Sequence, residues 1–140
     1  MLKDFVLKYY LDQNYNCAEG ILRAGNEYYH LGLDEHAMLM VAGFGGGVQT
    51  GNLCGAVLGA VCLLSYRYVE TKSHESDDIK PVVNLLFERL KEEFGNSLNC
   101  EEVKPKFHTE ENRCAKTVLL ACDILEKVIA EYENKTENMK

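Results

Sequence analysis

The stretch from residue 37 to residue 66 contains no charged side chain, and it constrains the fold more than any other part of the chain. A segment of this length is long enough to cross a bilayer as one helix. Its middle, however, holds Gly45-Gly46-Gly47 followed by polar Gln49 and Asn52, and irregular backbone of this kind would leave hydrogen-bonding groups unsatisfied in lipid. We therefore expect no membrane insertion, and predict two buried helices joined by a glycine-rich loop.

The rest of the chain also shows helical patterns. Apolar residues recur at helical spacing, and no segment alternates as a strand would. The signals that start and stop helices are N-capping residues, a proline in a first turn and a glycine after a last turn. These signals stand at Asn16 with Glu19, and at Asp34, Pro81, Gly95 and Thr109.

The six helices predicted in this way span about residues 2–13, 17–31, 35–44, 53–70, 79–94 and 110–132. We expect residues 99–108 to be irregular. The fold class is all-α, with a single compact helical bundle over residues 1–132. Residues 133–140 are expected to form a frayed C-terminal tail.

The charge of the chain excludes one class of partner. Its formal net charge is -7, and no stretch concentrates the Lys and Arg that phosphate binding needs, so we expect no nucleic-acid surface. The glycine-rich loop before the fourth helix exposes backbone N–H groups, as phosphate-binding loops do. It lacks the P-loop pattern and no predicted strand precedes it, which argues against a nucleotide site.

Six cysteines are present in a chain of 140 residues, which is long enough to fold around a core without disulfide bonds. The N-terminal residues run directly into an amphipathic helix and show no secretory signal, so we expect a cytoplasmic protein. In a reducing compartment, cysteines are free thiols, metal ligands or transient disulfides.

Four of the six cysteines stand at predicted helix starts or in the polar link between helices. They are Cys17, Cys54, Cys100 and Cys114. A helix N-terminus favours an anion, so a thiol placed there ionises more readily and becomes a nucleophile or a metal ligand. Cys62 and Cys122 lie inside apolar helical runs, where we expect them to be buried and unreactive.

These residues resemble the C_GCAxxG_C_C family, a group of small bacterial and archaeal redox-active proteins. Cys17 corresponds to the first family cysteine, Cys54 with Gly55, Ala56 and Gly59 to the CGAxxG element, and Cys100 and Cys114 to the last two. The resemblance extends from Asn16 to the last helix. It implies that the four cysteines converge on one site and act as redox-active thiols or as metal ligands. Similar four-cysteine domains occur fused to electron-transfer modules.

Three functions are compatible with these four cysteines. The leading interpretation is electron transfer through an iron–sulfur cluster or another metal centre, because thiolates are the soft donors that such centres need. No C-x-x-C pair is present, so two cysteine pairs that cycle between dithiol and disulfide, with no metal, fit equally. The third is a zinc-containing or partner-binding module without turnover.

The sequence leaves several points open around this site. It does not show whether the chain is an enzyme, which protein is its redox partner, or whether it forms a homo-oligomer. His108 could be a further ligand, a base that activates a cysteine, or an exposed loop histidine, and the last is the commonest case. The remaining histidines, His30, His36 and His74, are weaker candidates.

Cys54 is the strongest single candidate. It follows glycine-rich backbone, and Gly55, with Gly59 one turn further, would let a cofactor or partner atom approach the sulfur. We therefore expect Cys54 to be alkylated faster than the other three motif cysteines. We also expect the four sulfurs to share one pocket, with Cys62 and Cys122 outside it.

Overall fold

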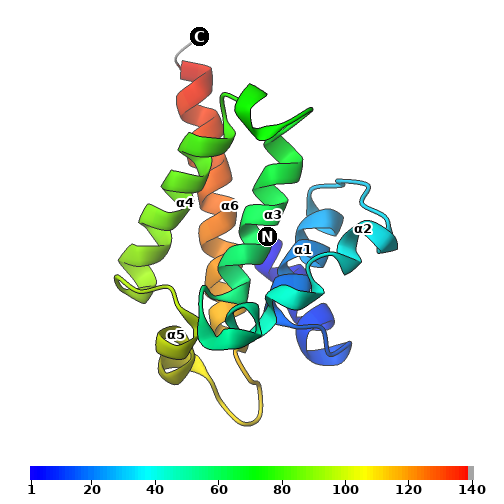
Figure 1. Cartoon of the computed structure of the whole chain (residues 1–140), viewed down its shortest axis with the longest axis vertical. Helices are drawn as coiled ribbons and strands as arrows, with labels where there is room; N and C mark the ends of the chain where they lie inside the picture. Colours follow the sequence, from blue (N-terminus) through cyan, green and yellow to red (C-terminus); the bar gives the residue numbers. More distant parts are fainter. Residues whose placement is uncertain (139–140) are drawn as a thin grey trace.

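The computed structural model describes residues 1–138, in which every regular element is helical (Figure 1). The helices are α1 (Cys17–Tyr28), α2 (Glu35–Leu39), α3 (Gly55–Tyr68), α4 (Ile79–Phe94), α5 (Cys100–Phe107) and α6 (Ala115–Asn138). Short helical turns occur at Leu2–Phe5, Lys8–Asp12, Ala42–Phe44, Gly47–Gly51 and Ser73–Glu75. The predicted all-α fold is confirmed.

Helix α3 is the central helix of the bundle. It contacts α1, α4 and α6, while α5 lies across the lower end of the molecule in Figure 1. Leu63 and Leu64 of α3 are completely buried, as are Leu86 of α4 and Leu125 of α6. The charge-free stretch thus supplies one core helix, α3, as its composition predicts. The second buried helix expected from it is wrong, because α2 ends at Leu39 and Met38 is its one buried residue. No helix within residues 1–138 is long and apolar enough to span a membrane.

Small residues let α1 and α3 approach closely. A Cβ atom at Gly59 of α3 would lie 2.6 Å from the carbonyl oxygen of Ala18 in α1. A Cβ atom at Gly25 of α1 would lie 1.7 Å from Cδ1 of Leu63. At Gly59 only glycine fits, because the neighbour is backbone and cannot move aside, whereas a side chain at Gly25 would require Leu63 to shift.

Local signals correctly predict the start of α1 and both ends of α4. The Asn16 side chain accepts a hydrogen bond from the Glu19 N–H, and the Glu19 carboxylate accepts one from the Asn16 N–H. This is the predicted capping box at the start of α1. Helix α4 has the predicted bounds, with Pro81 in its first turn and Gly95 after its last residue at a φ of +98°.

The predicted irregular segment 99–108 is wrong, because residues 100–107 form α5. Pro105 removes one backbone donor near the end of this helix, which makes the sequence resemble a loop. Contacts far along the chain compensate: Val103 is buried, the Lys106 ammonium donates to the Phe94 carbonyl at 2.8 Å, and the Phe107 ring packs edge-on against Phe94.

The predicted bounds of the last helix are also wrong. Helix α6 begins at Ala115, and Thr109 instead accepts a hydrogen bond from the Asn112 N–H in the preceding turn. The helix continues to Asn138, so most of the expected tail is helical. Arg67 at the end of α3 binds Glu133 at 2.8 Å, which fastens this part of α6 to the bundle. Residues 139 and 140 lie outside the described residues.

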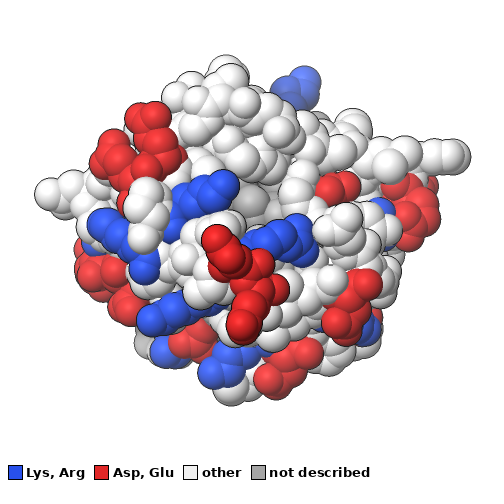
Figure 2. Space-filling view, turned by 90° about the horizontal axis from the view of Figure 1, so that it is seen from below, with Lys and Arg blue, Asp and Glu red and all other residues white. Residues whose placement is uncertain are grey.

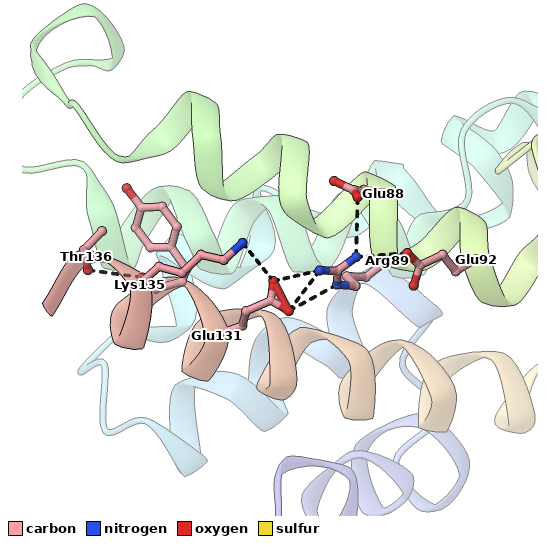
Figure 3. Close-up of polar contacts among 7 residues, drawn as sticks. Glu88, Arg89, Glu92, Glu131, Lys135 and Thr136 are labelled. Carbon is pink, nitrogen blue, oxygen red and sulfur yellow. Dashed lines mark hydrogen bonds and ion pairs between the residues drawn. The ribbon is translucent and has the colours of Figure 1, made fainter. Parts of the chain in front are cut away.

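An ion-pair network joins α4 to α6 on the surface (Figure 3). Arg89 of α4 donates to Glu131 of α6 at 2.9 Å, and Glu131 also pairs with Lys135 at 3.6 Å. The hydrogen bond from Arg89 lowers the pKa of the Glu131 carboxyl. Partly exposed pairs of this kind add little free energy of folding, so the apolar contacts of the core carry most of the α4–α6 association.

Candidate functional site

Four helices begin at the four motif cysteines. Cys17 and Cys100 are the first residues of α1 and α5. Cys54 and Cys114 immediately precede α3 and α6, and the carbonyl of each accepts the first helical hydrogen bond, from Leu58 and Val118 respectively. Each cysteine is therefore placed where unpaired N–H groups and the helix dipole produce partial positive charge.

Three of these cysteines line one small pocket of about 160 Å³. The pocket lies where α1, α5 and α6 start, at the lower end of the molecule in Figure 1. Its lining is made by Cys17, Cys100 and Cys114 together with Tyr10, Asn16, Gly46, Lys104, His108 and Arg113. Segments far apart in the sequence therefore supply the thiols of a single site.

Cys54 lies beside this pocket and is only 6% exposed. Its neighbour Gly55 is in contact with Cys17, because a Cβ atom at Gly55 would lie 2.5 Å from the Cys17 sulfur. Negative charge on either Cys17 or Cys100 would raise the pKa of Cys54.

The other two cysteines lie elsewhere. Cys122 is completely buried in α6. Cys62 is only partly buried, so the expectation that it is buried is wrong. It lines a separate, apolar cavity of about 590 Å³. That cavity is formed by Leu22, Leu33, Ala37, Met40, Val41, Phe44, Ser65, Tyr66, Val69, Ser73 and Ile79 with Cys62.

Burial raises the pKa of the Cys54 thiol to about 12, and the nearby Cys17 adds to the rise. The N–H groups of Ala56 and Val57 at the start of α3 oppose it but are outweighed. This burial argues against the expectation that Cys54 is the most reactive motif cysteine. A helix N-terminus activates a thiol only where the thiol is not deeply desolvated.

Cys114 is surrounded by polar and cationic side chains as well as by apolar ones. Burial raises its pKa, and the proximity of Cys100 adds to the rise. Lys104, Tyr10 and Arg113 act in the opposite direction by stabilising the thiolate. For Cys17, burial again raises the pKa, and the N–H groups of Gly46 and Ala18 oppose the rise.

The glycine-rich loop forms a left-handed turn beside these thiols. Gly46, Gly47, Val48 and Gln49 all have φ between 59° and 65°. Val48 and Gln49 are strained there, because left-handed backbone costs a residue with a side chain about 1–2 kcal/mol. At Gly47, a Cβ atom would lie 2.7 Å from the Cβ atom of Cys100, so the turn packs directly on this cysteine.

The same loop also determines where α5 begins. The carbonyl of Asn52 accepts a hydrogen bond from the Cys100 N–H at 2.6 Å, and the carbonyl of Leu98 accepts one from the Cys54 N–H at 2.8 Å. These two backbone bonds hold the start of α3 against the start of α5. The predicted break of the helix at the glycines is confirmed, and its consequence is a close approach of Cys54 and Cys100.

The cofactor-binding role expected for Gly55 and Gly59 is replaced by a packing role. The space beside Gly55 is filled by the Cys17 sulfur and by the Phe44 carbonyl, 2.9 Å from the position of a Cβ atom. The space beside Gly59 is filled by the backbone of Ala18. At both glycines, the space that a side chain would take is already occupied by protein atoms.

The chemistry of the four motif thiols suits the expected metal centre, whereas their placement does not. Four thiols have the soft chemistry that zinc and iron–sulfur clusters require. Within residues 1–138, however, no three Cys, His, Asp or Glu side chains are placed to hold one metal ion. Cys17, Cys54, Cys100 and Cys114 as arranged here therefore do not fit a four-thiolate centre.

Three residues of the pocket were not singled out from the sequence. The Tyr10 hydroxyl accepts a hydrogen bond from the Cys114 N–H at 2.9 Å. The Arg113 guanidinium donates to the Tyr10 carbonyl and stacks 4.2 Å from the centre of its ring. Lys104 follows Cys100 by four residues, a spacing that puts both on one face of a helix, but this signal is visible only once α5 is known to be helical.

A family model described as "Putative redox-active protein (C_GCAxxG_C_C)" matches residues 15–128. The matched region includes all four motif cysteines and five of the six α-helices in full. The chain belongs to this family. Membership in the C_GCAxxG_C_C family confirms the resemblance carried by Cys17, Cys54, Cys100 and Cys114. No curated protein and no solved structure matches the chain.

Proposed function

We propose that this member of the C_GCAxxG_C_C family is a thiol–disulfide redox protein. The observation that carries the proposal is the gathering of four thiols, each at a helix start, in and beside one pocket. Their placement does not suit a metal ion, so reversible disulfide formation is the redox chemistry that fits this donor set. Electron transfer through a metal centre, the leading interpretation of the sequence, is not favoured by this spacing.

The reaction needs a disulfide of another molecule as oxidant. A thiolate at the pocket attacks one sulfur of that disulfide, a mixed disulfide forms, and the first partner thiol leaves. A second protein cysteine then attacks the mixed disulfide and releases the second partner thiol. Two protein thiols have lost two electrons and two protons in total, and the partner disulfide has gained them.

Cys114 is our candidate for the attacking thiol. It lines the pocket, and the nearby Lys104, Arg113 and Tyr10 favour its thiolate over what burial alone would allow. Cys100 and Cys17 line the same pocket and are candidates for the resolving thiol. Cys54, which is almost fully buried, would exchange only with these protein cysteines and not with a partner in solution.

A redox titration with thiol counting tests the proposal. The protein is equilibrated anaerobically in buffers of defined glutathione redox ratio, quenched in acid, alkylated after unfolding and weighed by mass spectrometry. We expect two or four thiols to be lost reversibly, and the same loss in the matched control Cys62→Ser. Retention of all six thiols at every ratio would contradict the proposal. So would purification of the reduced protein with stoichiometric zinc or iron bound by these cysteines.

A further inference from the structure

We propose that the thiol pocket selects small disulfides whose arms carry a negative charge, such as a carboxylate. The inference rests on the proposed function and adds a substrate class to it. It depends on the pocket, on the cations that line it and on its size.

The lining of the pocket is cationic in an otherwise acidic protein. Lys104 and Arg113 line the pocket, and no Asp or Glu does so, although the chain carries a net charge of -7. Within residues 1–138, neither Lys104 nor Arg113 forms an ion pair with a carboxylate. Their charges are therefore not neutralised by a partner in the protein.

The molecular surface agrees with this arrangement. Figure 2 views the end of the molecule at which α5 lies, and Lys and Arg side chains flank a recess near the middle of that face. Asp and Glu side chains also lie near the middle of this face, beside the Lys and Arg side chains. Because charges of both signs occur together there, the face is not the broad basic surface that would attract a large polyanion.

Lys104 and Arg113 lie close to the thiols in different ways. Lys104 is one helical turn after Cys100 in α5, and its charge reaches the Cys114 sulfur. Arg113 directly precedes Cys114, and Tyr10 holds its guanidinium through a carbonyl hydrogen bond and a ring stack. A carboxylate bound by these two side chains would place a sulfur a few bonds away against Cys114.

The size of the pocket limits the ligand. A volume of about 160 Å³ is below the range of about 300–1,000 Å³ that is typical of sites for drug-sized ligands. It holds one arm of a small disulfide and not a folded protein segment. The helix starts that surround the pocket add partial positive charge in the same place.

Exchange rates with three small disulfides of different charge test this proposal. The reduced protein is mixed at low salt with dithiodiglycolate, bis(2-hydroxyethyl) disulfide or cystamine, which are anionic, neutral and cationic. Each rate is divided by the rate of the same disulfide with 2-mercaptoethanol, which removes its intrinsic reactivity. We expect the normalised rate of the anionic disulfide to exceed that of the neutral disulfide at least about tenfold, and to exceed that of the cationic disulfide by a larger factor. High salt should reduce both preferences.

Lys104→Met should reduce the anionic-to-neutral ratio several-fold, because it removes one of the two cations of the pocket. Any change in the thiolate population of Cys114 affects both rates equally and cancels in the ratio. Lys91→Met, which removes an exposed charge of α4 that does not line the pocket, should leave the ratio unchanged. Equal normalised rates for the three disulfides, or a ratio that Lys104→Met does not alter, would overturn the charge selection and leave the redox function standing. Absence of reaction with all three would overturn both.

Discussion

Cys54 and Cys114 occupy the same position relative to their helices, each immediately before the first helical residue. Their surroundings differ, because Cys54 is 6% exposed whereas Cys114 lies at a pocket with Lys104, Arg113 and Tyr10 around it. A helix N-terminus is worth about 0.3–2 kcal/mol to an anion. The rise in the pKa of Cys54 from 9.0 to about 12 corresponds to about 4 kcal/mol against the thiolate. Burial therefore outweighs helix position at Cys54.

This difference predicts the order in which the thiols are alkylated. At pH 8, Cys54 should carry on the order of 1,000-fold less thiolate than an unperturbed cysteine, and its sulfur is also poorly accessible. With iodoacetamide and peptide mapping of the reduced, folded protein, we expect Cys114 to be labelled well before Cys54. Cys122 should react only after unfolding. Labelling of Cys54 as fast as Cys114 would show that burial does not control this thiol.

At the scale of the elements, the sequence predicts the helices whose signals are local and fails where the signal is distant. The reciprocal bonds of Asn16 and Glu19 and the placement of Pro81 depend on neighbours within a few residues, so they can be read directly. Helix α5 depends on the burial of Val103 and on contacts of its end with Phe94, more than ten residues earlier in the chain. The pattern of residues within α5 cannot predict these contacts.

The crossing of α1 and α3 gives the element-scale prediction. Gly59→Ala would place a Cβ atom 2.6 Å from the backbone of Ala18, so the two helices must separate. We expect a loss of about 1–3 kcal/mol in the free energy of unfolding, measured by urea denaturation. Gly43→Ala is the matched control, since no atom lies within 4 Å of its Cβ position. It should change stability by less than about 0.5 kcal/mol, and equal losses in both variants would disprove the packing role.

For the molecule as a whole, the family motif indicates which four cysteines to compare but not how they are arranged. The left-handed turn at Gly46 and Gly47 and the bond from Cys100 to Asn52 bring α5 to the start of α3. Neither feature has a sequence pattern beyond the glycines themselves. The cationic lining could not be predicted either, because Lys104 and Arg113 meet only after α5 and α6 are packed together.

The buried thiols also make the stability of the whole reduced protein dependent on pH. Between pH 9 and about 12 the unfolded chain releases the Cys54 proton while the folded protein retains it. The contribution of the protonated Cys54 thiol to the free energy of unfolding is complete below pH 9. It is lost as the pH approaches 12, by about 1.4 kcal/mol per pH unit for one such group. Urea unfolding under reducing conditions at pH 8, 9.5 and 10.5 should show this decline. The decline should be shallower in Cys54→Ala, and an identical slope in the two proteins would contradict the assignment.

The most direct test of the proposed redox function is a map of the disulfides that form when the reduced protein is oxidised by a stoichiometric small disulfide. Alkylation of the remaining thiols followed by peptide mass spectrometry identifies each bond. We predict bonds only among Cys17, Cys54, Cys100 and Cys114, all reversed by dithiothreitol, with Cys62 and Cys122 recovered as thiols. Bonds that involve Cys62 or Cys122 in the folded protein, or no intramolecular bond at all, would contradict a four-cysteine redox site.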